Sequence, residues 1–178
     1  MSYPRLRGEK DLASFRDRAL RQRGAFSSRV LVCSTGCRAL GATALAEAFR
    51  TKLAAAGLDG KAQVVEVGCH GQCARAPLVL IEPQEYLYGG VSPADVDEII
   101  DKTVRGGRCV ERLCETTGGK TAATMAQSPF YRSQRREVFR TCGRMDPKRI
   151  EDAVAEGSYA AAAKMLATMA PQQVIDEV

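Results

Sequence analysis

Apolar and polar positions along the first hundred residues follow the pattern of an α/β domain. Short apolar runs rich in β-branched residues predict buried strands at 29–33, 63–67, 78–81 and 85–88. Apolar positions at helical spacing predict helices at 9–23 and at 40–56, where the apolar stripe includes Leu45, Phe49 and Leu53. The capping-box pattern Ser92-Pro93-Ala94-Asp95 predicts the start of a further helix over 92–104. Since a strand–helix–strand unit gives a parallel pair and a hairpin adds antiparallel strands, this order predicts a mixed four-stranded sheet flanked by helices.

The pattern changes after residue 114. Residues 115–128 (ETTGGKTAATMAQS) are small and polar, which is typical of a linker. Beyond it, 130–140 is expected to be extended, and helices are expected after Asp146-Pro147 and over 158–170. The predicted parts are a basic N-terminal helical lead-in (1–28), the sheet domain (29–114), the linker (115–128) and a helical C-terminal extension (129–178). This last part has little apolar bulk, so we expect it to pack on something larger.

Charge and composition narrow the class of protein. The net charge is +5, but it is concentrated in two arginine-rich flanks: seven basic against three acidic residues in 1–28, and seven against two in 131–149. These flanks fit docking on a protein partner as well as polyanion binding, and no nucleic-acid motif accompanies them. The N-terminus is polar and no apolar run approaches the ~18 residues of a membrane span. We expect a soluble, cytoplasmic protein that binds no nucleic acid.

Four of the seven cysteines occupy equivalent places in the predicted sheet. Cys33 and Cys37 follow the first strand (CSTGC), and Cys69 and Cys73 follow the second (GCHGQC). Adjacent parallel strands present their carboxyl ends at one edge, so the two loops should form one rim. Four thiolates from paired loops are what a [2Fe–2S] cluster requires. The sequence therefore predicts Cys33, Cys37, Cys69 and Cys73 as metal ligands.

The residues around these cysteines suit a negatively charged cluster. Gly36, Gly68 and Gly71 allow positive φ and close approach of the backbone to sulfur. The helix predicted after Cys37 would direct its N-terminal amides toward an anion. Neither loop contains Asp or Glu.

Other interpretations of the cysteines and the histidine stay open. A structural zinc site or a dithiol redox pair is possible, although both prefer two residues between paired cysteines, whereas these pairs have three. His70, the single histidine, could be a ligand, but Rieske-type ligation needs two; a loop side chain facing solvent, or a hydrogen-bond donor beside the cluster, is the alternative. Cys109 and Cys114 are either spare ligands or buried thiols, and Cys142 is expected to be a packing residue.

Two stretches carry a resemblance to a known family. GCHGQCARAPLVLIEP, with the following YLYGGVSPADVDEII, resembles thioredoxin-like [2Fe–2S] ferredoxin domains. Such domains form the small flavoprotein-associated subunit of respiratory complex I and its relatives in NAD-linked hydrogenases and formate dehydrogenases. The tail, from SPFYRSQRREVFRTCGRMDP onward, resembles the segment that leads into the flavin domain of the large NADH-binding subunit. The resemblance implies a thioredoxin-like fold.

The same resemblance implies a function. It describes a one-electron relay in an NAD(P)H-linked multi-centre oxidoreductase, whose partners are a flavin/NADH-binding domain or subunit and other iron–sulfur subunits. FMN and NAD(P)H would then bind outside this chain, which contains no G-x-G-x-x-G loop and is not expected to be catalytic alone. The chain also departs from the family in placing three residues, not four, between the first two cysteines. A zinc-binding or metal-free docking module and a free-standing ferredoxin are the alternatives.

Overall fold

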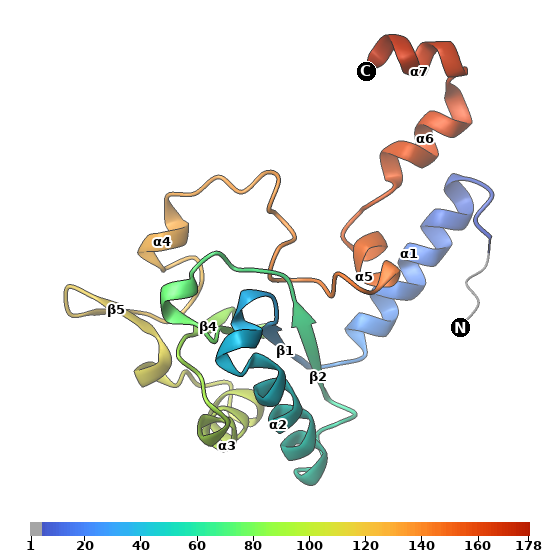
Figure 1. The fold of residues 1–178 in the computed structure, drawn as a ribbon. Coiled ribbons are helices and arrows are strands. Elements are labelled where there is room, and N and C mark those ends of the chain that lie inside the picture. The colour runs from blue at the N-terminus through green and yellow to red at the C-terminus, as the bar shows by residue number, and fades with distance from the viewer. Residues whose placement is uncertain (1–4) are drawn as a thin grey trace. The chain divides into compact units, whose positions relative to one another are not determined.

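The predicted strands form one mixed sheet in the computed structural model, which describes residues 5–178 (Figure 1). The strands are β1 (Ser28–Cys33), β2 (Ala62–Val67), β3 (Val79–Glu82) and β4 (Tyr86–Tyr88). Their order across the sheet is β2-β1-β3-β4, with β1 and β2 parallel and the other two pairs antiparallel. The α/β class predicted from the sequence is confirmed.

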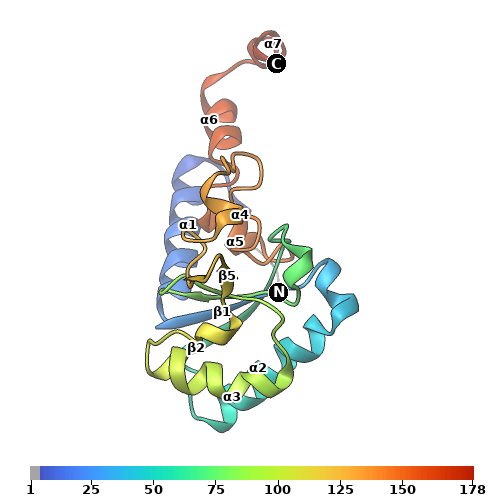
Figure 2. The same ribbon diagram turned by 90° about the vertical axis from the view of Figure 1, so that its left-hand side faces the viewer.

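The central strand is covered on both faces, which explains its continuous apolar run. Every residue of β1 is buried, and even Arg29 is paired with Glu82 at 2.8 Å. One face packs on α2 (Ala42–Ala55) and α3 (Val96–Ile99), which lie on the same side of the sheet (Figure 2). The largest side chains of this layer are fully buried: Phe49, Leu45, Leu53, Ile81, Tyr88 and Ile99.

The opposite face is covered by the segment that the sequence indicated as a linker. Residues 115–128 contain the hairpin of β5 (Glu115–Thr117) and β6 (Lys120–Ala122), and α4 (Pro129–Arg132) follows. Met125 and Tyr131 pack against Leu31, Leu80 and Leu87 of the sheet. Residues 115–131 therefore pack on the sheet, with Met125 and Tyr131 against this face. Phe130 and Tyr131 lie in a short helix rather than in the extended segment expected over 130–140.

Contacts divide the chain at points other than the predicted boundaries of 28, 114 and 128. One unit is Phe26–Asp146; the other combines residues up to Ala25 with Pro147–Val178. The first four residues of the predicted 1–28 lead-in lie outside the described part of the chain. Whether the predicted parts are functional domains stays a prediction.

Every regular element described in the second unit is a helix. Its helices are α1 (Glu9–Gly24), α5 (Ile150–Ala155), α6 (Ala160–Thr168) and α7 (Pro171–Glu177). Leu12 and Phe15 of α1 pack on Val154, and Arg23 pairs with Glu156 at 2.5 Å. By contrast, α6 and α7 contain no buried residue. Among residues 5–178, no helix has both the length and the apolarity to cross a membrane.

The predicted capping signal at Ser92 is confirmed. The Ser92 backbone N–H and hydroxyl both donate to the Asp95 carboxylate, at 2.8 and 2.7 Å, and Pro93 occupies the first turn. The helical segment has the expected extent but changes type, since α3 ends at Ile99 and is followed by a wider π-helical turn, Ile100–Arg105.

Candidate metal centre

The first cysteine pair lies where β1 ends. Cys33 is the last residue of β1, and Cys37 lies in the 3-10 turn Gly36–Leu40 that precedes α2. The two Sγ atoms are 3.4 Å apart, and both residues are buried. Thiolates that share a tetrahedral metal at about 2.3 Å stand about 3.7 Å apart. This pair is therefore already close to the separation that one iron requires.

The chemistry of this pair also fits metal binding. Burial, and after it the neighbouring Cys33, raise the pKa of Cys37 to about 12, whereas a backbone hydrogen bond with Leu78 acts in the opposite direction. Without metal, the Cys37 thiol therefore keeps its proton, and binding to a metal must displace it. Cys69 also contributes to the raised pKa, which places its sulfur within electrostatic range of Cys37.

The second pair lies in the loop after β2. Cys33 is paired with Val67 in the parallel ladder, so this loop leaves the same edge of the sheet as the first one. Cys69 and Cys73 are both exposed. The backbone N–H of Gly71 lies 3.2 Å from the Cys69 sulfur, in a turn where Gly71 has φ +86°. Gly71 thus has the role predicted for it, while Gly36 and Gly68 do not adopt positive φ.

The two pairs are not gathered around a single ion. Within residues 5–178, no group of three or more His, Cys, Asp or Glu side chains is arranged to hold one metal ion. A binuclear cluster instead takes two thiolates on each of its irons. Two cysteine pairs on neighbouring loops, with backbone N–H groups near the sulfurs and no carboxylate in either loop, fit that requirement.

His70 is not the solvent-facing residue that the sequence suggested as one alternative. Its side chain is only 2% exposed, and neither ring nitrogen has a hydrogen-bond partner among the described residues. Burial, and after it the positive charges of Arg136 and Arg144, lower its pKa to about 4. His70 is therefore a neutral, buried residue in the loop that contains the second pair.

Residues beyond the predicted sheet domain pack over the His70 loop. The Tyr131 hydroxyl donates to the His70 carbonyl at 2.8 Å. A Cβ on Gly143 would lie 2.4 Å from the His70 ring, and one on Gly71 would lie 3.8 Å from Phe130. We call Phe130, Tyr131 and Gly143 the loop cover. The sequence analysis did not predict the loop cover. The adjacent aromatic residues Phe130 and Tyr131, in an otherwise polar stretch, were the one feature that could have indicated it.

Arg75 also has a structural role that the sequence did not indicate. It is half-buried, and its guanidinium donates to the Leu113 carbonyl at 3.1 Å. A Cβ on Gly89 would lie 2.9 Å from the Arg75 carbonyl oxygen, so the backbones approach closely here. Arg38, by contrast, is exposed.

The remaining cysteines lie in other surroundings. The sulfurs of Cys109 and Cys114 are 3.1 Å apart, and both residues belong to the layer between the sheet and α2–α3. Cys142 is half-buried.

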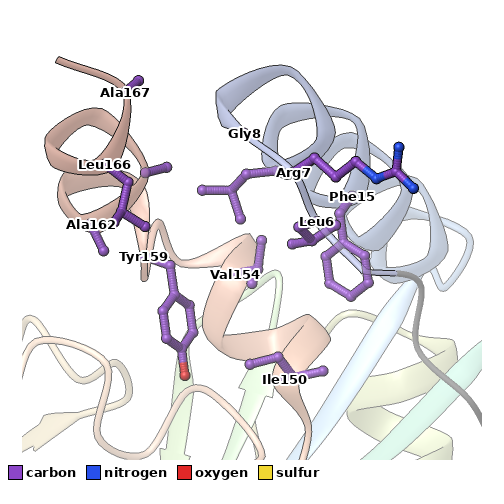
Figure 3. Close-up of a pocket in the computed structure, with 12 residues that line it drawn as sticks. Leu6, Arg7, Gly8, Phe15, Ile150, Val154, Tyr159, Ala162, Leu166 and Ala167 are labelled. Atoms are coloured by element: carbon purple, nitrogen blue, oxygen red, sulfur yellow. The ribbon is translucent and has the colours of Figure 1, made fainter.

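The helical unit contains an apolar hollow of about 620 Å³. Residues of α1, α5 and α6 line it, among them Phe15, Val154 and Leu166 (Figure 3). Its lining contains no Cys, His, Asp or Glu. It therefore offers no ligands to a metal.

Paired cysteine loops at one edge of a mixed four-stranded sheet define an iron–sulfur protein of the thioredoxin-like class. The thioredoxin-like [2Fe-2S] ferredoxin family matches residues 16–104, half of the chain, and the chain belongs to this family.

The chain is also similar to individual ferredoxins. It is 31% identical to a "Ferredoxin, 2Fe-2S" of Clostridium pasteurianum over 77 residues, which is 43% of this chain and 76% of the relative. It is 42% identical to a "Ferredoxin, 2Fe-2S" of Aquifex aeolicus over 55 residues, 31% of this chain and 50% of the relative. The crystal structure of the wild-type thioredoxin-like [2Fe-2S] ferredoxin from Aquifex aeolicus aligns with a TM-score of 0.47 and 31% identity, covering 52% of this chain and 100% of that one.

Family membership confirms the thioredoxin-like fold, the [2Fe–2S] cluster and the role in electron transfer. It favours iron–sulfur over zinc as the occupant of the cysteine site. The assignment of Cys33, Cys37, Cys69 and Cys73 as the four ligands stays a prediction.

Proposed function

We propose that this chain is the one-electron relay of an NAD(P)H-linked multi-centre oxidoreductase, with its cluster held by Cys33, Cys37, Cys69 and Cys73. The observation that carries the proposal is the pair of cysteine loops, which leave the same sheet edge from the paired residues Cys33 and Val67. The cluster supplies reversible one-electron chemistry when bound. The chain's own residues hold and insulate it.

The two halves of the site differ in exposure to solvent. This difference determines the side from which a redox partner can exchange an electron with the cluster. Cys33 and Cys37 are buried, whereas Cys69 and Cys73 are exposed. A partner's redox centre approaches the second pair, because protein atoms cover the first. No Asp or Glu lies in either loop to repel an electron-rich partner or to destabilise the reduced cluster, whose net charge is about −3.

The proposed link to NAD(P)H rests on chemistry and on the tail. Hydride transfer moves two electrons, so a flavin must stand between the nucleotide and a one-electron centre. The tail resembles the segment that leads into such a flavin domain. It also exposes large apolar side chains: Leu166 is 78% exposed and Ile175 67%. We infer that α6 and α7 dock on a flavin/NADH-binding domain or subunit.

The first test is a reductive titration of the purified chain. Visible absorbance, iron and acid-labile sulfide should indicate one cluster per chain, and dithionite should reduce it by one electron with an electron paramagnetic resonance signal. A colourless protein with bound zinc would overturn the proposal.

The second test concerns the partner. Mixed with a flavin- and NADH-binding oxidoreductase subunit of the same organism, the chain should be bleached by NADH. The double variant Leu166→Asp/Ile175→Asp should lose this reaction and keep dithionite reduction, while Val138→Asp, at a position 87% exposed, serves as control. Equal NADH reduction of all three forms would favour a free-standing ferredoxin instead.

A further inference from the structure

Two cysteines that the proposed cluster does not use lie side by side. The Sγ atoms of Cys109 and Cys114 are 3.1 Å apart, although both are free thiols. A disulfide bond is about 2.0 Å long, so the two sulfurs need to approach by only about 1 Å to be joined. They flank a single 3-10 turn, Glu111–Leu113, whose short span keeps the thiols at high effective concentration.

The two thiols differ in access. Cys109 is partly exposed and follows the exposed Gly107 and Arg108, whereas Cys114 is only 8% exposed. Cys114 also donates to the Val110 carbonyl at 3.6 Å. A reagent from solvent therefore reaches Cys109 first, and Cys114 lies behind it.

The surroundings of Cys114 make it the second of the two thiols to react. Burial and, to a smaller extent, the neighbouring Cys109 raise its pKa to about 12, so Cys114 carries its proton in the reduced protein. The positive charge of Arg75 opposes this rise. The same arginine donates to the Leu113 carbonyl and so holds the turn between the two cysteines.

We propose that Cys109 and Cys114 form a reversible thiol–disulfide site that exchanges with small-molecule disulfides. The Cys109 thiolate attacks one sulfur of the disulfide R–S–S–R, forming a mixed disulfide and releasing RS⁻. Cys114 then loses its proton and attacks the Cys109 sulfur, which expels the second RS⁻. Two protein thiols are oxidised by two electrons, one R–S–S–R is reduced to two RSH, and the two protons pass to the released thiolates. The proposal does not depend on the electron-transfer partner or on the identity of the cluster ligands.

The sequence supplies a direct test, because trypsin cleaves between the two cysteines at Arg112. The cluster-loaded protein is incubated anaerobically with oxidised glutathione or with dithiothreitol, quenched in acid, alkylated and digested. The peptides CVER (109–112) and LCETTGGK (113–120) should appear joined, lighter than their sum by two hydrogens. The joined pair should be about tenfold or more enriched in the oxidised sample and disappear with dithiothreitol, while the visible spectrum is unchanged.

Two variants sharpen the outcome. Cys114→Ser should trap glutathione on Cys109, since the second thiol is missing, and Cys142→Ser should form the joined peptides as the unaltered chain does. Glutathione that persists on Cys109 of the unaltered chain would overturn the proposal. So would unmodified 109 and 114 thiols in a sample whose Cys142 is modified, or a linkage to Cys33, Cys37, Cys69 or Cys73.

Discussion

The hydroxyl of Tyr131 donates a hydrogen bond to the main-chain carbonyl of His70 at 2.8 Å, across 61 positions of sequence. His70 lies between Cys69 and Cys73, so this bond ties the second cysteine loop to a segment that follows the predicted sheet domain. That segment also lies beyond residues 16–104, which the family match covers. The position of the loop is therefore determined partly by residues that the family relationship does not include.

Removing any one of the four predicted ligands should abolish or severely weaken cluster binding. Cys33→Ala, Cys37→Ala, Cys69→Ala and Cys73→Ala each leave an iron under-coordinated. The purified variants should lose their visible absorbance and most of their iron, while Cys142→Ala keeps both. If Cys109→Ala were colourless while Cys37→Ala kept its visible absorbance, the ligands of the first half of the site would be assigned wrongly.

Gly143→Ala should make the cluster labile. The new methyl group would lie 2.4 Å from the His70 ring, and the residue would keep φ +82°, so both the ring and the loop must shift. Gly118→Ala is the matched control, since Gly118 has φ +57° but open space around its Cβ position. Backbone strain of roughly 1–2 kcal/mol should affect both variants. In the presence of an iron chelator, Gly143→Ala should lose its visible absorbance several times faster than the unaltered chain, and Gly118→Ala should not. Equal rates for the two variants would contradict the close packing of Gly143 on His70.

Tyr131→Phe should destabilise the sheet domain by about 1 kcal/mol, the usual contribution of one hydrogen bond. The ring still fills the space beside Leu31 and Leu80, so the effect isolates the bond to the His70 carbonyl. Urea unfolding measures the change, and Tyr159→Phe at a position 56% exposed should have no effect. Identical unfolding midpoints for all three proteins would mean that the bond contributes nothing.

His70→Leu should keep the visible spectrum and should not lower the free energy of unfolding. The imidazole is buried without hydrogen-bond partners among the described residues, and burying such a polar group is unfavourable by roughly 1–3 kcal/mol. A leucine of similar bulk removes that cost. Absorbance and urea unfolding at pH 7 test the expectation. A shifted spectrum would instead assign the ring a direct role at the metal.

A fragment of residues 26–146 should be more stable than one of residues 26–114. The shorter fragment lacks Met125 and Tyr131, which leaves the apolar face formed by Leu31, Leu80 and Leu87 open to water. Urea unfolding with a colour readout compares them. If the shorter fragment holds its cluster equally well, residues 115–146 are dispensable, as the linker interpretation implied.

The sequence was sufficient for the elements whose pattern is local. The β1 run, the Leu45–Phe49–Leu53 stripe and the Ser92 capping signal each reflect residues within a few positions of one another. The loop cover could not be predicted in this way. The contact between Gly143 and His70 joins distant positions, and a glycine reveals nothing of what its missing side chain makes room for.

The hairpin of β5 and β6 shows a second limit. Its strands have three residues each and are mostly exposed polar residues, so no alternation distinguishes them from a linker. The buried Met125 and two backbone hydrogen bonds, Leu87 N–H to the Ala123 carbonyl and Met125 N–H to the Glu85 carbonyl, attach the segment to the sheet, and none of these contacts is visible in sequence periodicity.

The pairing of Cys33 with Val67 makes the position of the second cysteine loop sensitive to the length of β2. Side chains alternate along a strand, so one residue inserted into β2 would turn Val65 and Val67 away from the core or move Cys69 by about 3.3 Å. Exchanges among Val, Ile and Leu in β2 leave that spacing intact. Such exchanges should therefore leave the second loop in place, whereas an insertion or deletion of one residue within β2 should displace the predicted ligand Cys69 and weaken cluster binding.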